Sequence, residues 1–336
     1  MLHRKAELYN VAEMIDLEAA GDRVLSRLPD ALRRSLNPHA VKSAPRSAGC
    51  EIRFNLKGEQ ARVVIEHGSE KSLVEVYRGP FLSTWHPLTP GRPCEISVGR
   101  EALAPQLKDL AGRADLSYDP DLVRIILPHL GWTRLLELEG DLAPPRPEQT
   151  PARRCLMYGS SITHGYHGIR PSGSYAMLTA RRLGVDLINL GFGGGAWMEP
   201  QLADYIAGRT DWDFAILEMG INVIREMEAA DFEARVDYFI ARIAAAHPEK
   251  WLFCIDVFSF RDDFDPALAK PELFRQAVRR TVRRVNSKRV VHLDGRRLLT
   301  DFGGLTTDLV HPSPDGMAEM ADRLAGAVSR RMEKPV

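Results

Sequence analysis

CLMYGSSITHG, residues 155–165, is the stretch that decides the fold of this sequence. Its first four residues are apolar and predict a short buried strand, which breaks at Gly159, a residue that permits a sharp turn. Ser160 and Ser161 follow at this turn, ahead of a helical pattern that begins near Ser174. Parallel sheets place reactive groups at the carboxyl ends of their strands, so a serine here is a candidate nucleophile, although serine after glycine is also ordinary turn chemistry.

From this stretch to the end of the chain, apolar strand-like runs alternate with helical periodicity. The alternation predicts a parallel sheet with helices on both faces, in a flavodoxin-like three-layer α/β domain. The expected strands are Cys155–Tyr158, Asp186–Leu190, Phe214–Glu218, Trp251–Phe258 and Val290–Leu293. The expected helices are Ser174–Leu183, Glu199–Ala207, Ala230–Ala246, Pro271–Val285 and Pro314–Met332.

The first 140 residues carry a different pattern. After Gly49, short strand-like runs are separated by breaks rich in Gly, Pro or charge, which predicts a β-sandwich of jelly-roll-like type. Its expected strands are Cys50–Phe54, Ala61–Ile65, Leu73–Tyr77, Cys94–Val98, Leu122–Leu127 and Thr133–Leu138. Before them, leucines spaced three and four apart predict one or two leading helices between residues 8 and 37.

A proline-rich run at 143–151 is the clearest linker signal in the chain. Because 336 residues are too many for one comfortable core, we expect two domains. The expected organisation is a sandwich domain with its leading helix at 1–140, a linker at 141–153 and the α/β domain at 154–336.

Lys+Arg and Asp+Glu balance at 45 each, which predicts no nucleic-acid or membrane partner. The N-terminus lacks the apolar core of a signal peptide, and no uncharged apolar stretch approaches the roughly 20 residues that span a bilayer. We therefore expect a soluble, cytoplasmic protein. The four cysteines are scattered without metal-ligand spacing, which favours reduced, structural thiols; homo-oligomerisation stays open.

Three loops at the ends of predicted strands carry groups that could serve a nucleophilic serine. The run Gly191–Gly195 can turn backbone N–H groups outward, and the amide of Asn222 can add a donor. Asp308 and His311, three residues apart before the last helix, can form a base held by a carboxylate. Each residue also has an ordinary explanation as a turn or a helix cap, but their order at successive strand ends favours a catalytic site.

These blocks, Gly159-Ser160-Ser161, Asn189 to Gly194, Gly220-x-Asn222 and Asp308-x-x-His311, resemble those of the SGNH (GDSL-like) hydrolase family. More loosely, the whole chain is similar to a subgroup with an N-terminal β-sandwich. The resemblance implies a Ser161 nucleophile, an Asp308 and His311 pair that completes the triad, and an oxyanion hole made by Ser161, Gly194 and Asn222. Gly193 replaces Gly194 if the register in the glycine run is shifted by one.

The family's usual Asp before the nucleophile is Ser160 in this chain, so either serine could attack, and Ser161 is the preferred one. The resemblance implies an esterase for short acyl groups, often acetyl esters of sugars, with an acyltransferase as the alternative. The expected partner is a small-molecule or carbohydrate ester, and no cofactor is expected.

Three rival sites deserve testing. Gly191-x-Gly193-x-x-Ala196 fits a loose dinucleotide fingerprint, with Glu218 as the ribose-binding acid, but it follows the second strand of the domain and leaves the serine unexplained. His164 and His167 have a spacing that could suggest a metal, yet no third ligand is evident and we expect a metal-free site. The aromatic residues Tyr77, Phe81 and Trp85 could stack on a sugar, but core packing is the favoured interpretation.

Overall fold

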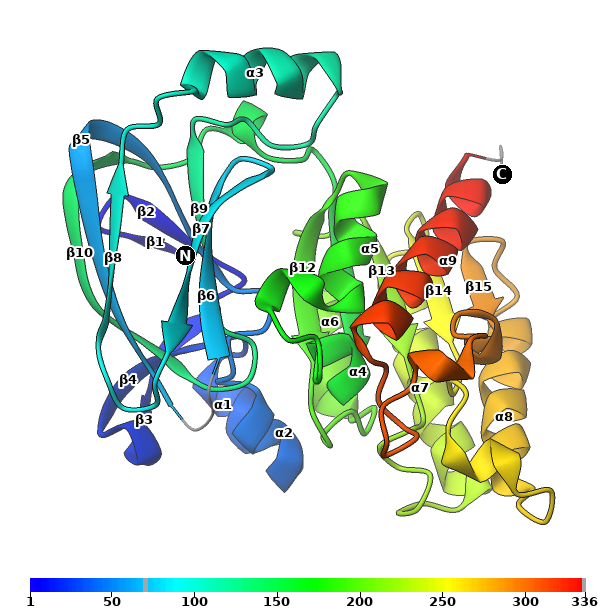
Figure 1. Ribbon diagram of the computed structural model, residues 1–336. Helices are drawn as coiled ribbons and strands as arrows, with labels where there is room; N and C mark the ends of the chain where they lie inside the picture. Colours follow the sequence, from blue (N-terminus) through cyan, green and yellow to red (C-terminus); the bar gives the residue numbers. More distant parts are fainter. Residues whose placement is uncertain (69–71, 334–336) are drawn as a thin grey trace.

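The chain forms two lobes in the computed structural model, which describes residues 1–68 and 72–333 (Figure 1). The N-terminal lobe consists mainly of antiparallel strands, and the C-terminal lobe is a parallel sheet between two layers of helices. Both expected fold classes are therefore confirmed. The last three residues of the expected α/β domain lie outside the described residues.

The sheet of the C-terminal lobe has five parallel strands in the order β12-β11-β13-β14-β15, which is the flavodoxin-like order. These strands are β11 (Arg154–Gly159), β12 (Asp186–Gly191), β13 (Phe214–Glu218), β14 (Trp251–Ile255) and β15 (Val290–Leu293). The helices are α5 (Tyr175–Leu183), α6 (Pro200–Gly208), α7 (Ala229–Ala246), α8 (Lys270–Val285) and α9 (Pro314–Met332). One face of the sheet packs on α5 and α9 and the other on α6, α7 and α8, so both faces are buried. Of the expected elements, only the strand at 251–258 is clearly shorter, since β14 ends at Ile255.

The N-terminal lobe is organised around β5 (Glu51–His67), a strand long enough to belong to two layers. Its first residues pair with β2 and β9, and its residues from Gln60 onward pair with β8 and β10. The expected strands at 50–54 and 61–65 are thus one continuous strand. The other strands of this sheet are β1 (Leu2–His3), β2 (Ala6–Tyr9), β6 (Ser72–Arg78), β7 (Phe81–Leu88), β8 (Cys94–Gly99), β9 (Leu122–Ile126) and β10 (Thr133–Ala143). Helix α3 (Ala104–Arg113) lies across one end of the lobe (Figure 1).

The helical prediction for residues 8–37 is wrong over most of its length. Besides the end of β2, this segment holds the hairpin β3 (Glu13–Leu17) and β4 (Asp22–Ser26), and only then the short helix α1 (Asp30–Arg34); α2 (Pro38–Ser43) follows it. The leucine spacing misleads because Leu28 and Leu36 are buried against the core of the C-terminal lobe rather than along one helix. Pro38 is the first residue of α2, a common position for proline, and Pro29 directly precedes α1.

The segment between the lobes is packed rather than free. Strand β10 continues to Ala143, and the Gln149 side chain is buried, where its amide exchanges hydrogen bonds with that of Asn55 (2.7 and 2.8 Å). Nearby, Arg53 on β5 makes two hydrogen bonds to Asp186 at the start of β12 (2.7 and 2.8 Å). The boundaries 1–140, 141–153 and 154–336 stay a prediction about folding units.

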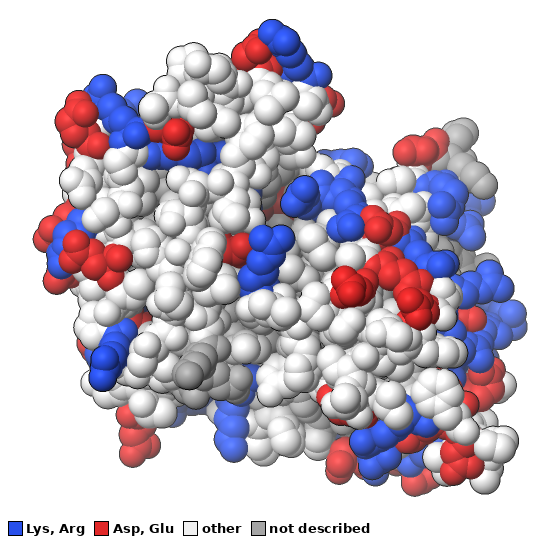
Figure 2. All heavy atoms as spheres, viewed as in Figure 1, with Lys and Arg blue, Asp and Glu red and all other residues white. Residues whose placement is uncertain are grey.

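None of the helices in the described part of the chain is long and apolar enough to cross a membrane. Figure 2 shows acidic and basic side chains interspersed over one face of the molecule, with a broad uncharged area on the N-terminal lobe. This mixture of signs agrees with the balanced composition.

Candidate active site

The two serines of the decisive stretch have different surroundings. Strand β11 ends at Gly159, and Ser160 caps the short helix α4 (Ser161–His164), with its buried Oγ accepting a hydrogen bond from the Ile162 N–H (3.1 Å). Ser161 Oγ instead lies 2.7 Å from Nε2 of His311. The fold therefore uses Ser160 to shape the turn and presents Ser161 to the histidine.

His311 is held from its other side by Asp308. Its Nδ1 lies 2.7 Å from Asp308 Oδ2, while Asp308 Oδ1 accepts hydrogen bonds from the backbone N–H groups of Val310 and His311 (2.8 and 2.9 Å). Partial burial alone would raise the pKa of Asp308, but these hydrogen bonds, with another from Thr306, hold it well below its usual value. The carboxylate stays ionised at neutral pH and orients the imidazole through Nδ1.

Glu218, at the end of β13, supports the turn that carries Ser161. Its buried carboxylate accepts hydrogen bonds from the Ser160 N–H and from Oγ1 of Thr163. Burial raises the pKa of Glu218, and these hydrogen bonds only partly offset the effect. A Cβ built on Gly159 would lie 2.3 Å from Glu218 Oε2, so the close approach of this carboxylate requires glycine there. The sequence analysis missed this role of Glu218. An acidic residue at the end of an apolar strand could have indicated it.

Three donors that could stabilise an oxyanion face the same space. Ser161 is the first residue of α4, so its N–H has no acceptor within the helix. In the described part of the chain the Gly194 N–H has no acceptor either, whereas the Gly193 N–H donates to Ser43 Oγ (2.9 Å). Asn222 Oδ1 accepts from the Ala196 N–H (3.1 Å), which leaves its Nδ2 free to donate. Gly194 has φ +74°, a left-handed conformation that favours glycine.

A cavity of about 440 Å³ brings these groups together. Ser161, Gly194, Asn222 and His311 all line it, and Asp308 lies behind His311, outside the lining. Apolar walls come from Ile221, Ile224, Phe260 and Val310, and Tyr166 packs its ring near that of His311 (centroids 5.2 Å apart). The size is that of a small-molecule site. All five sequence-predicted residues therefore meet at one place.

The N-terminal lobe takes part in this site through α2, which lies along the glycine run. Asn37, the residue that caps α2, donates hydrogen bonds to Glu199 Oε1 (2.7 Å) and to the Gly195 carbonyl (3.0 Å). At the other end of α2, Ser43 accepts the Gly193 N–H. The helix thus fixes both ends of the loop that holds Gly194, a contribution that the sequence analysis did not find.

Arg27 joins the two lobes beneath this loop. Its buried guanidinium donates to the carbonyls of Gly191 (2.7 Å) and Asn189 (3.1 Å) on β12. It also donates to those of Ser43 (2.8 Å), at the end of α2, and Arg46 (2.7 Å), just after α2. No carboxylate among the described residues pairs with it, and burial lowers its pKa to about 10. Main-chain carbonyl groups are therefore the main partners of this charge, with Nδ1 of His164 at 3.5 Å and the Phe192 ring beside it.

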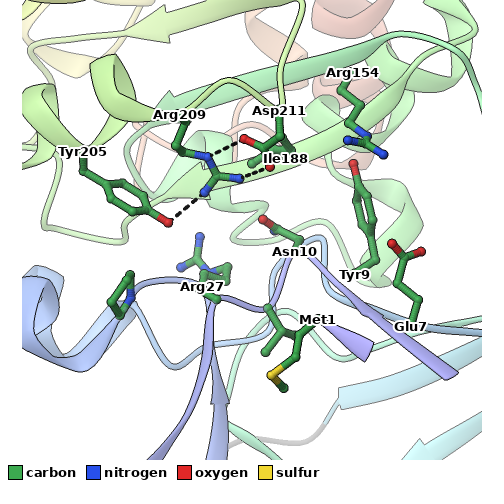
Figure 3. A pocket seen from close by; sticks show the side chains of 13 residues that line it. Met1, Glu7, Tyr9, Asn10, Arg27, Arg154, Ile188, Tyr205, Arg209 and Asp211 are labelled. Atoms are coloured by element: carbon green, nitrogen blue, oxygen red, sulfur yellow. Dashed lines mark hydrogen bonds and ion pairs between the residues drawn. The ribbon is translucent and has the colours of Figure 1, made fainter. Parts of the chain in front are cut away.

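A second cavity, of about 400 Å³, lies between the lobes and is drawn in Figure 3. Tyr9 and Asn10 of the N-terminal lobe face it from one side, and Arg209 from the other, bonded to Asp211 and Tyr205. Its described lining residues include no serine, cysteine or histidine. The cavity therefore offers no nucleophile of the kind found around Ser161.

The structure also bears on the two rival interpretations, a dinucleotide site at the glycine run and a metal site at His164 and His167. A Cβ on Gly195 would lie 2.5 Å from the Ala40 backbone nitrogen, so α2 covers the glycine run where a dinucleotide phosphate would have to bind. The ring nitrogens of His164 lie within hydrogen-bond distance of two backbone carbonyls, but His167 lies beside Asp308 and His311, with ligand atoms within 4.8 Å of one another. The sequence analysis therefore missed a third potential ligand, and a metal-free site stays a prediction.

The core-packing interpretation of the aromatic residues is correct for Tyr77 and wrong for Trp85. Tyr77 is 8% exposed, whereas Trp85, on the outer strand β7, is 57% exposed. The reason is that, among the described strands, β7 lies at the edge of the sheet and pairs only with β6, so part of its surface faces solvent.

Fold and sequence together define an α/β ester hydrolase. Residues 157–319 match the GDSL-like Lipase/Acylhydrolase family, and this part of the chain belongs to it. No curated protein sequence matches the chain significantly.

Among solved structures, a salicylyl-acyltransferase from a tetracycline biosynthetic pathway is similar over 98% of this chain and 94% of its own, with 21% identity and a TM-score of 0.80. A protein from Bacteroides ovatus assigned as a GDSL-like lipase covers 98% and 96%, with 20% identity and a TM-score of 0.73. A family two carbohydrate esterase from Clostridium thermocellum, solved with cellohexaose, covers 86% and 94%, with 17% identity and a TM-score of 0.62. At these identities the similarity shows the fold, and it includes the N-terminal lobe.

Proposed function

We propose that this protein is a serine esterase that hydrolyses short-chain acyl esters, with acetyl esters of carbohydrates as the preferred substrates. The observation that carries the proposal is the chain of two 2.7 Å contacts, Ser161 Oγ to His311 Nε2 and His311 Nδ1 to Asp308 Oδ2. Ser161 and His311 line a cavity whose size suits a small molecule. The proposal that the substrate is a carbohydrate ester draws on the similarity to a carbohydrate esterase.

In this mechanism His311 accepts the Ser161 proton as Oγ attacks the acyl carbonyl, and Asp308 keeps Nδ1 protonated. The N–H groups of Ser161 and Gly194 and the Asn222 amide stabilise the oxyanion. The tetrahedral intermediate collapses as His311 returns the proton to the leaving alcohol, which leaves an acyl group on Ser161. Water, deprotonated by His311, then attacks this acyl-enzyme. As the bond from the acyl carbon to Oγ breaks, His311 gives the proton to Ser161 Oγ and the free acid is released.

Acyl transfer is the second candidate, because one of the solved structures similar over 98% of this chain is a salicylyl-acyltransferase. The acyl-enzyme is the same in both reactions, and only the group that attacks it differs. An alcohol bound in the cavity of Ser161 would replace water and receive the acyl group.

The test is hydrolysis of 4-nitrophenyl acetate, butyrate and octanoate by the wild type, Ser160→Ala and Ser161→Ala. We expect the acetate to react fastest and Ser161→Ala alone to abolish turnover, with Ser160→Ala retaining activity at reduced stability because its helix cap is lost. A serine-directed phosphonate should add its mass to the peptide that contains Ser161. Adding a primary alcohol separates the two candidates, since a transferase forms the new ester in excess over the free acid. A folded wild type inactive on every chain length, with and without alcohol, would contradict both candidates.

A further inference from the structure

Arg46 is a cation without a partner in the wall of the catalytic cavity. Its half-buried side chain lines the space beside Ser161 and makes no ion pair or hydrogen bond within the described ranges 1–68 and 72–333. Charged groups withdrawn from water are normally paired, because the lost hydration has to be replaced. A guanidinium left unpaired in a ligand cavity is therefore available to a ligand.

The backbone of Arg46 is fixed within the N-terminal lobe. Its N–H donates to the Ser43 carbonyl (3.1 Å), its own carbonyl accepts from Arg27 (2.7 Å), and it forms an isolated bridge with Trp132. The main chain from which the side chain extends is therefore well supported, and the side chain forms part of the cavity wall.

The guanidinium also lies close to the nucleophile. A methyl group built on Gly193 would lie 3.8 Å from Ser161 Cβ and 3.9 Å from Arg46 Nη1. Gly193 therefore lies between the two groups, and a substrate of a few bonds' length could reach both.

The other charged residues of the cavity do not neutralise Arg46. Arg225 and Arg261 both lie near Asp262, at 3.1 and 3.7 Å, so their charges are partly compensated. Glu226 is the acidic side chain of the lining; it is exposed and forms no ion pair with Arg46. The cavity near Ser161 is therefore positive.

We propose that Arg46 binds an anionic oxygen group of the substrate, a carboxylate or phosphate a few bonds from the scissile ester. The planar fork of the guanidinium matches two oxygens of such a group, and a bond between charged partners is stronger than a neutral one. The proposal rests on the esterase function proposed above and narrows its substrate class to acidic esters. The anion belongs either to the acyl half or to the alcohol half.

The experiment compares esters that differ only in charge. For the acyl half, the 4-nitrophenyl monoester of fumaric acid is compared with 4-nitrophenyl crotonate; for the alcohol half, 4-carboxyphenyl acetate is compared with 4-carbamoylphenyl acetate. The ratio of kcat/KM for the anionic and neutral members is measured for the wild type, Arg46→Ala and Arg46→Lys. Arg225→Ala is the matched control, because it removes a lining arginine that already has an acidic neighbour.

We expect the wild type to prefer the anionic member of one pair, which identifies the half that carries the charge. Arg46→Ala should lower that ratio about 10- to 100-fold through KM, the size of a lost charge-assisted hydrogen bond. Arg46→Lys should restore part of the ratio, and Arg225→Ala should change it less than threefold. A ratio unchanged in Arg46→Ala would overturn the proposal, as would an equal loss on both members, which would place Arg46 at the reacting carbonyl.

A wild type that cleaves none of these esters would contradict the esterase function, and the anion site is then tested without turnover. Calorimetry on Ser161→Ala with monomethyl fumarate and with methyl crotonate measures binding alone. Binding of only the acid, lost in the Ser161→Ala, Arg46→Ala double variant, would support the anion site. Equal binding of both compounds, or no binding, would overturn it.

Discussion

Ser43→Ala tests whether the N-terminal lobe maintains the oxyanion loop. Ser43 belongs to α2, is buried, and offers the acceptor for the Gly193 N–H at 2.9 Å. Removing the hydroxyl deletes one hydrogen bond with a net value of about 1 kcal/mol, which should lower the melting temperature by about 2 °C.

The fall in kcat should be larger than the small loss of stability would suggest. Complete loss of an oxyanion donor costs about 10²–10³ in kcat, and Ser43→Ala loosens the neighbour of Gly194, the proposed donor, without deleting Gly194 itself. We therefore expect kcat on 4-nitrophenyl acetate to fall about tenfold, with little change in KM.

Ser47→Ala is the matched control. Ser47 lies in the same segment and is equally buried, but its Oγ has no hydrogen-bond partner among the residues that the structure describes. Its replacement should leave kcat unchanged and stability unchanged or slightly higher, because no bond is lost. Equal loss of kcat in both variants, or normal kcat in Ser43→Ala, would refute the idea that α2 positions the loop.

Three further predictions concern Asn222, Glu218 and the buried His129. Asn222→Ala should lower kcat about 10²–10³-fold with KM nearly unchanged; a large rise in KM alone would contradict its assignment as an oxyanion donor. Glu218→Ala should lower the free energy of unfolding by about 2–4 kcal/mol, because it leaves a cavity and the buried Ser160 N–H without an acceptor; Glu218→Gln, which keeps an acceptor oxygen, should lose less in urea denaturation. Burial lowers the pKa of His129 to about 4, so between pH 6.5 and 4 the unfolded chain binds a proton that the folded chain does not. The free energy of unfolding should therefore fall by about 3 kcal/mol as the pH decreases through this range, and His129→Gln should lack this part of the pH dependence.

The sequence predicted the α/β lobe well because each of its elements satisfies a local rule. The strand that ends at Gly159 and the helix that begins after Ser174 can be recognised from neighbouring residues alone. The residues proposed for catalysis were visible for the same reason, since Asp308 and His311 interact three positions apart and strand ends converge in any parallel sheet.

The N-terminal contributions could not be predicted, because they depend on contacts between distant segments. Arg27 is 162 residues before the Asn189 carbonyl that it bonds, and its acceptors are backbone atoms that leave no mark in the sequence. Leu28 and Leu36 were misread for a related reason: their spacing fits a helix, but their burial is against the other lobe.

The acceptors of Arg27 have a consequence for how the sequence can vary. Four carbonyl oxygens hold its guanidinium, and no amino-acid replacement at positions 43, 46, 189 or 191 removes a carbonyl oxygen. This one joint between the lobes therefore depends on a single side chain, that of Arg27, beside the separate contacts of Arg53 with Asp186 and of Asn37 with Glu199. In a saturation scan, position 27 should accept almost no substitute.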